Sequence, residues 1–109
     1  MATPKITKIS DADYEANVGK GCAVVKFYAT WCGACKAIEP VYAALAGQYR
    51  RVQFFQVDVD QNTETVTKMN INAMPTFMFY VDGKHVPDYD IVGPRKVQLT
   101  QTLEVLNRQ

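Results

Sequence analysis

The sequence lacks several features that mark out particular classes of protein. It has 109 residues and three cysteines, an odd number and too few for the disulfide scaffold of a small secreted domain. It contains a single histidine, and 12 basic against 11 acidic residues leave a net charge of +1. A charge so close to zero gives no electrostatic reason to expect binding to nucleic acid or to a membrane surface.

Long hydrophobic runs are absent as well. No apolar stretch is long enough to cross a bilayer as a helix, and residues 1–5 lack the apolar character of a secretory signal. With so few cysteines, the simplest expectation is a reducing compartment, the cytoplasm. No linker, repeat or low-complexity segment divides the chain, and 48% hydrophobic residues suit one folded core. We therefore expect a single domain over residues 1–109, acting as a monomer.

What the sequence does contain is a Cys-x-x-Cys motif, Cys32 to Cys35, between a predicted strand and a predicted helix. The apolar run 22–29, interrupted by Lys26, predicts a central strand that is covered on both faces. Beyond the motif, apolar side chains recur at three- and four-residue spacing, which predicts an amphipathic helix kinked at Pro40. A Cys-x-x-Cys at such a junction indicates thiol–disulfide chemistry.

The remaining elements follow the same kind of pattern. Ser10 has the position of a helix N-cap, and Asp82-Gly83 indicates a hairpin turn into a strand that runs through Tyr89 to Val92. The predicted order is β-α-β-α-β-α-β-β-α, with parallel strands in the alternating part and an antiparallel hairpin at the end. The fold class is therefore α/β, a central mixed sheet with helices on both faces. The further strands are expected at 6–9, 52–57 and 76–81, and the further helices at 62–69 and around 99–106.

Several stretches together resemble the thioredoxin family over nearly the whole chain. A lone Cys-x-x-Cys is a moderate signal, but flanking Trp31 and Lys36, Pro40 five residues beyond Cys35, and a late Met74-Pro75 make it strong. The resemblance implies the thioredoxin fold and a protein-disulfide reductase. The matching stretches are 27–33, 35–36 with Pro40, 57–60, 74–77 and 92–93.

The expected reaction is dithiol–disulfide exchange through a reversible Cys32–Cys35 disulfide. At the start of a helix, Cys32 faces unpaired N–H groups that favour thiolate over thiol, so it is expected to attack the substrate disulfide. Cys35 would then attack the mixed disulfide and release the reduced substrate. Inert buried cysteines are one alternative. A zinc site is another, but it needs four ligands, and Cys22 and His85 do not form a paired set.

The resemblance also implies the partners. Disulfide-containing proteins would be the substrates, and electrons would come from an NADPH-dependent thioredoxin reductase. The chain shows no nucleotide-binding glycine fingerprint, so we expect no bound flavin or nicotinamide, and no metal.

A substrate groove is expected around the first sulfur. Trp31 would shield the thiol and supply a flat apolar surface, with its indole N–H bonded to Asp60. The resemblance implies that Pro75 is cis, which would bring the Met74 backbone opposite Cys32 to pair with an extended substrate segment. The expected substrate-binding residues are Trp31, Gly33, Ala34, Met74, Pro75, Val92 and Gly93.

Two residues depart from the family pattern. Ala34 stands where the family usually has proline, and its extra N–H near the sulfurs predicts a less reducing, more easily reduced disulfide. Lys26 stands where the family usually has a buried aspartate, and Gln56 where that aspartate's lysine partner lies. A thioredoxin-fold adaptor with little redox activity would also tolerate such changes, although both cysteines are kept.

Three roles are open for Lys26. It can take the proton from Cys35 and count as catalytic, it can stabilise nearby thiolates by its charge, or it can extend to solvent with no role. Burial would lower its pKa unless an acid pairs with it, and Asp58 and Glu39 are the candidate acids.

Overall fold

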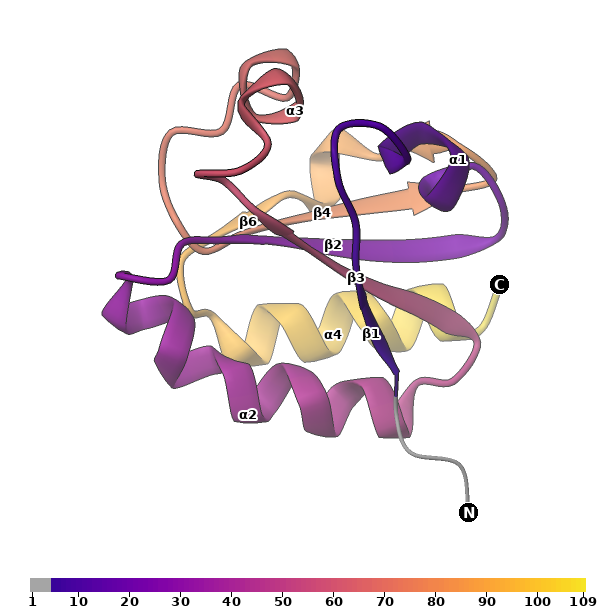
Figure 1. Cartoon of the computed structure of the whole chain (residues 1–109). Helices are drawn as coiled ribbons and strands as arrows, with labels where there is room; N and C mark the ends of the chain where they lie inside the picture. Colours follow the sequence, from indigo (N-terminus) through magenta and orange to yellow (C-terminus); the bar gives the residue numbers. More distant parts are fainter. Residues whose placement is uncertain (1–4) are drawn as a thin grey trace.

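A mixed sheet runs through the middle of the molecule and is covered by helices on both faces (Figure 1). The structure is a computed structural model, and it describes residues 5–109. Helices α1 and α3 lie on one face of the sheet, and α2 and α4 on the other (Figure 1). The expected α/β class, a mixed sheet between two helical layers, is confirmed. The strands are β1 (Ile6–Lys8), β2 (Cys22–Tyr28), β3 (Val52–Asp58), β4 (Thr76–Val81), β5 (Lys84–His85) and β6 (Ile91–Val92), and the helices are α1 (Tyr14–Val18), α2 (Gly33–Gln48), α3 (Thr63–Lys68), α4 (Lys96–Asn107) and the 3-10 turn η1 (Pro87–Tyr89).

The strand order is β1-β3-β2-β4-β5, with β6 paired to β4. Strand β3 is parallel to both β1 and β2, as expected for the alternating part of the sequence. Strand β4 is antiparallel to β2, so the connection from β3 through α3 to β4 does not give the parallel strand that the alternating pattern predicted. Helix α3 has six residues and is too short to return along the sheet, so β4 begins at the end where β3 finished.

Strand β2 is the central strand that the apolar run predicted. Its residues from Cys22 to Phe27 are all buried. Because side chains alternate along a strand, Val25 and Phe27 pack towards α1 and α3, while Cys22 and Val24 pack towards α2 and α4. Lys26 belongs by this alternation to the α2 side, which decides its neighbours.

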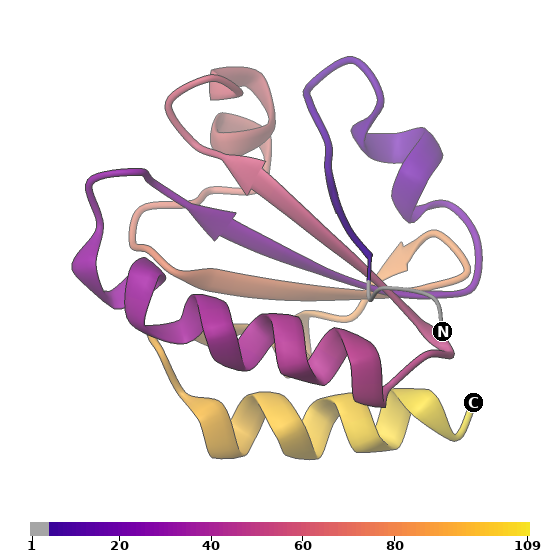
Figure 2. The same cartoon turned by 60° about the horizontal axis from the view of Figure 1, so that its bottom comes forward.

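Helix α2 carries the amphipathic pattern read from the sequence. Ile38, Tyr42 and Leu45 are buried against the sheet. The helix continues through Pro40, and its first turns lie at an angle to the rest of the helix (Figure 2). Helix α4 packs beside it with Leu99, Leu103 and Leu106 buried. Within residues 5–109, no helix has both the length and the hydrophobicity needed to cross a membrane.

The predicted start of the first helix was wrong. Helix α1 begins at Tyr14 after Asp13, and Ser10 does not cap it. The Asp13 carboxylate instead accepts hydrogen bonds from the backbone N–H and the hydroxyl of Ser10. These bonds close a turn over residues 10–13, so the side chains that suggested a cap stabilise the turn before the helix.

The predicted last strand was also wrong in its extent. The hairpin after Asp82 reaches only to His85, and Tyr89 lies in the 3-10 turn η1. Pro87 has no backbone N–H for a strand ladder, so the chain leaves the sheet there. It returns as β6, which pairs Val92 with Thr76, the residue that follows Pro75.

Candidate active site

Cys32 is the N-cap residue of α2. Its backbone is extended, with φ −89° and ψ 114°, and its Sγ accepts a hydrogen bond of 3.1 Å from the backbone N–H of Cys35. The sulfur therefore lies at the positive end of the helix, in the position that a capping oxygen usually takes. Cys32 therefore has the position at the start of the helix that the sequence led us to expect.

Cys35 lies one turn further along and faces the interior. Burial, together with the neighbouring Cys32 sulfur, raises the pKa of the Cys35 thiol to about 11. The positive charge of Lys26 acts in the opposite direction. Cys35 therefore remains a thiol at neutral pH, and it must lose a proton before it can act as a nucleophile.

The loop before β4 closes the site on the other side of Cys32. The Met74–Pro75 peptide bond is cis, as expected, and the Met74 carbonyl oxygen lies 3.6 Å from Cys32 Sγ. The Gly93 N–H donates to the Pro75 carbonyl at 2.8 Å. Gly93 has φ +99°, a conformation that side chains disfavour, so this close approach of the two loops depends on glycine.

The surface around the sulfur is apolar and exposed. Trp31 is 67% exposed, and its indole N–H donates to Asp60 at 2.8 Å, which confirms the expected hydrogen bond. Val92, which pairs with Thr76 just after Pro75, is 52% exposed. Gly33 leaves open space where a side chain would stand, and Ala34 is partly buried. A partner protein that approaches Cys32 therefore meets open space at Gly33.

Ala34 is the second residue of α2, and its N–H is one of the free donors at the start of the helix. Among the described contacts the donor to Cys32 Sγ is the Cys35 N–H, a contact that the sequence did not reveal. Ala34→Pro remains a prediction: removing one N–H from the start of the helix weakens the positive field at Cys32 Sγ and should make the redox potential more negative by about 20 mV, or about 1 kcal/mol. Equilibration of both proteins with glutathione measures this, and an equal or more oxidising potential in the proline variant would contradict it.

Lys26 is buried in the centre of the sheet, 2% exposed, and does not extend to open solvent. Its Nζ lies 5.3 Å from the ring centroid of Tyr28 and 5.0 Å from that of Tyr42, within range of cation–π attraction. In the register of the sheet Lys26 lies beside Gln56. The family resemblance had paired the same two positions, as those of the usual aspartate and its lysine partner. Burial lowers the pKa of Lys26, and the charges of Glu39 and Cys35 oppose that shift.

The structure distinguishes the two candidate acids for Lys26. Glu39 shares a cavity with it, whereas the Asp58 carboxylate accepts a hydrogen bond from the Asp60 N–H and does not line that cavity. Among residues 5–109, neither acid lies within ion-pair distance of Lys26. The Lys26 amino group is thus buried next to two aromatic rings, and the Glu39 carboxylate lines the same cavity without forming an ion pair with it.

Lys26→Met should make the protein more stable. Methionine has similar length and no charge to desolvate, so we expect the free energy of unfolding to rise by about 1–3 kcal/mol at pH 7. Because burial lowers the folded-state pKa below the ordinary 10.5, the cost of burying the charge is full below the folded-state pKa and is lost as the pH rises from there towards 10.5. Urea unfolding at pH 7 and pH 10 measures this, with the exposed Lys36→Met as control. A loss of stability in Lys26→Met would contradict it.

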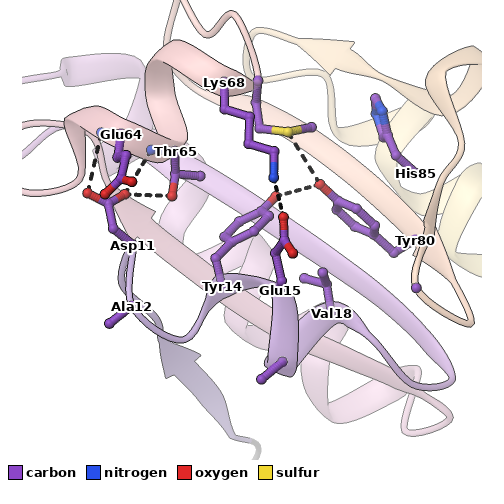
Figure 3. A pocket seen from close by; sticks show the side chains of 13 residues that line it. Asp11, Ala12, Tyr14, Glu15, Val18, Glu64, Thr65, Lys68, Tyr80 and His85 are labelled. Carbon is purple, nitrogen blue, oxygen red and sulfur yellow. Dashed lines mark hydrogen bonds and ion pairs between the residues drawn. The ribbon is translucent and has the colours of Figure 1, made fainter.

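A second and larger cavity, about 580 Å³, lies far from the sulfurs between α1 and α3 (Figure 3). Several of its polar side chains are paired with one another. The hydroxyls of Tyr14 and Tyr80 are 2.7 Å apart, and Glu15 forms an ion pair with Lys68. No three His, Cys, Asp or Glu side chains in the described part of the chain are placed to hold a metal ion.

The site combines a Cys-x-x-Cys at the start of a helix with a cis-proline loop opposite the first sulfur, on a mixed sheet between two helical layers. These features define a dithiol–disulfide oxidoreductase. The sequence model of the thioredoxin family matches residues 5–105. The chain belongs to the thioredoxin family, whose members are protein-disulfide oxidoreductases, and it is a thiol–disulfide oxidoreductase.

Individual relatives agree with this assignment. The chain is 39% identical over 98 residues to a thioredoxin of Gallus gallus, covering 87% of this chain and 91% of the relative. The thioredoxin of Trypanosoma brucei brucei matches its structure with a TM-score of 0.91 at 28% identity, covering 99% of this chain and 96% of that one. The thioredoxin of Fasciola hepatica gives a TM-score of 0.84 at 41% identity, covering 91% of this chain and 97% of that one.

Proposed function

We propose that this protein reduces disulfides in other proteins, with Cys32 as the attacking thiolate and Cys35 as the resolving thiol. The observation that carries the proposal is the position of Cys32 Sγ, which caps α2 and lies 3.6 Å from the Met74 carbonyl oxygen. The helix terminus stabilises the thiolate, and the Met74 backbone offers a hydrogen-bonding edge to an extended substrate segment. Attack on a substrate disulfide then forms a mixed disulfide at Cys32.

The groove around the sulfur is proposed to hold the substrate. Trp31 and Val92 supply exposed apolar surface on its two sides, and Met74, Pro75 and Gly93 form its backbone floor. Gly33 and Ala34 lie between the two sulfurs, where a substrate backbone must pass. Lys26 is proposed to act inside the protein by stabilising the Cys35 thiolate when it forms, because its charge lowers the pKa of that thiol.

Electrons are proposed to come from an NADPH-dependent thioredoxin reductase, with the Cys32–Cys35 disulfide as the group that is reduced. The compartment is proposed to be the cytoplasm, which suits three cysteines that are all free. Residues 1–109 are proposed to form one monomeric domain.

The test of the proposed function is NADPH oxidation in a mixture of this protein, a thioredoxin reductase and insulin. We expect oxidation that depends on all three components and continues until the insulin disulfides are reduced. No oxidation with any of several reductases would contradict the proposed electron source, while continued insulin reduction with dithiothreitol would leave the cysteine chemistry intact.

A further inference from the structure

A cavity of about 300 Å³ lies directly beside Cys35. It is bounded by strand β2, strand β3 and the first turns of α2, and polar side chains and apolar surface both contribute to its lining. A space of this volume is large enough to hold several water molecules, and the polar side chains of its lining can bind them. The lining residues are Lys26, Tyr28, Ala29, Thr30, Cys35, Lys36, Glu39 and Gln56.

The cavity connects Cys35 to the protein surface. Thr30, Lys36 and Glu39 are exposed residues that also line it, so the cavity reaches solvent at their side. Glu39 follows Cys35 by four residues on α2, and side chains at that spacing lie next to each other on one face of a helix. A proton leaving Cys35 therefore has a polar route outward that passes the Glu39 carboxylate.

The chemistry of the lining groups identifies the acceptor. In its ammonium form Lys26 has no lone pair to accept a proton, and its Nζ lies over the rings of Tyr28 and Tyr42, which attract that form. The hydroxyls of Tyr28 and Thr30 and the amide of Gln56 are not bases at neutral pH. An ionised carboxylate accepts only, and Glu39 supplies the one carboxylate among the residues that line this cavity.

We propose that Glu39 accepts the Cys35 proton through water in this cavity, while Lys26 stabilises the thiolate that remains. The inference rests on the proposed roles of Cys32 and Cys35 and adds a residue that neither the motif nor its flanks contain. In this chain the acid that handles the proton lies on the helix, and the strand position behind Cys35 carries a cation.

The S–H bond of Cys35 breaks and its proton moves through water to the Glu39 carboxylate, which becomes a carboxylic acid. The Cys35 thiolate attacks Cys32 Sγ, a Cys32–Cys35 disulfide forms, and the bond between Cys32 and the substrate sulfur breaks. The substrate leaves as a thiolate with the electron pair, and the Glu39 acid returns the proton to solvent. The dithiol is oxidised and the substrate disulfide is reduced.

The ionisable groups that face Cys35 decide how the rate depends on pH. Strand β2 contributes Lys26 and Tyr28, helix α2 contributes Lys36 and Glu39, and the helix start contributes Cys32. Strand β3 contributes the neutral Gln56. Removing Glu39 leaves no carboxylate in the lining, so the proton must then go to water or hydroxide from the solvent.

The experiment uses reduced protein in excess over 5,5′-dithiobis(2-nitrobenzoate). Attack by Cys32 releases a first thionitrobenzoate, and resolution by Cys35 releases a second, so absorbance in a stopped-flow instrument follows both steps. We expect Glu39→Gln to slow the second phase by about tenfold or more at pH 7 and to leave the first phase unchanged. The second phase of the variant should rise with pH more steeply than that of the unchanged protein between pH 6 and 9, and Glu39→Asp should restore most of its rate.

The matched control is Glu64→Gln, which makes the same charge change on α3 outside this cavity. The proposal would be overturned if the rate of the second phase in Glu39→Gln equals that of the unchanged protein. A faster second phase would also overturn it, because the removal of the negative charge near Lys26 would then matter more than the loss of a proton acceptor. An equal slowing of both phases would overturn it too, because Glu39 would then act on Cys32. A missing second phase in the unchanged protein would instead show that the proposed role of Cys35 is wrong.

Discussion

Replacement of Cys32 by serine is expected to abolish disulfide reduction. A hydroxyl at the start of α2 cannot become a thiolate, and among the described residues no other thiol lies at the start of this helix. We expect the rate of insulin reduction with dithiothreitol to fall at least about a thousandfold, to the background of dithiothreitol alone. The fold should not change, since serine is a good N-cap residue.

Cys22→Ser provides the matched control. Cys22 is buried at the start of β2, where its sulfur packs against the α2 side of the sheet, and burial raises the pKa of its thiol. It should remain an unreactive core residue, so its serine variant should lose some stability and keep its activity. Insulin reduction that survives in Cys32→Ser and disappears in Cys22→Ser would move the reaction to a different sulfur.

Replacement of Tyr42 by alanine is expected to cost about 3–5 kcal/mol of the free energy of unfolding. The side chain is fully buried, and its ring packs against Phe54 at 5.0 Å and Phe77 at 5.6 Å between ring centroids. The same ring lies under the Lys26 ammonium. Alanine would leave a cavity beneath a buried charge, and urea unfolding of the reduced protein measures the loss.

Tyr42→Phe separates the ring from the hydroxyl. The hydroxyl donates to the Phe55 carbonyl at 2.7 Å and lies 3.3 Å from the Val24 carbonyl. Losing these contacts should cost about 1–2 kcal/mol, because phenylalanine still fills the space. An alanine variant no less stable than the phenylalanine variant would show that the ring contributes little to the core.

The central strand and the catalytic helix could be predicted from sequence because short-range patterns determine them. The apolar run around Lys26 has no polar face, and the spacing of Ile38, Tyr42 and Leu45 fits one side of a helix. The Trp31–Asp60 hydrogen bond and the approach of Met74 to Cys32 came from the family resemblance. No periodicity in the sequence encodes either contact.

Two features could not be predicted from the sequence: the acid that faces Lys26 and the split of the last strand. Glu39 and Asp58 were equal candidates to face Lys26, and the packing of α2 on the sheet decides in favour of Glu39. The split of the last strand at Pro87 depends on the competition between the strand ladder and a 3-10 turn. In hindsight Pro87 was the available signal, since proline seldom continues a strand.

The most direct test of the central claim is to trap the mixed disulfide. Cys35→Ser should attack a disulfide-containing protein such as insulin through Cys32 and then stop, because no resolving thiol remains. Mass spectrometry of the non-reduced mixture should show a covalent adduct through Cys32 that dithiothreitol reverses. An adduct through Cys22, or no adduct although the unchanged protein reduces insulin, would contradict the assignment of Cys32 as the attacking sulfur and Cys35 as the resolving one.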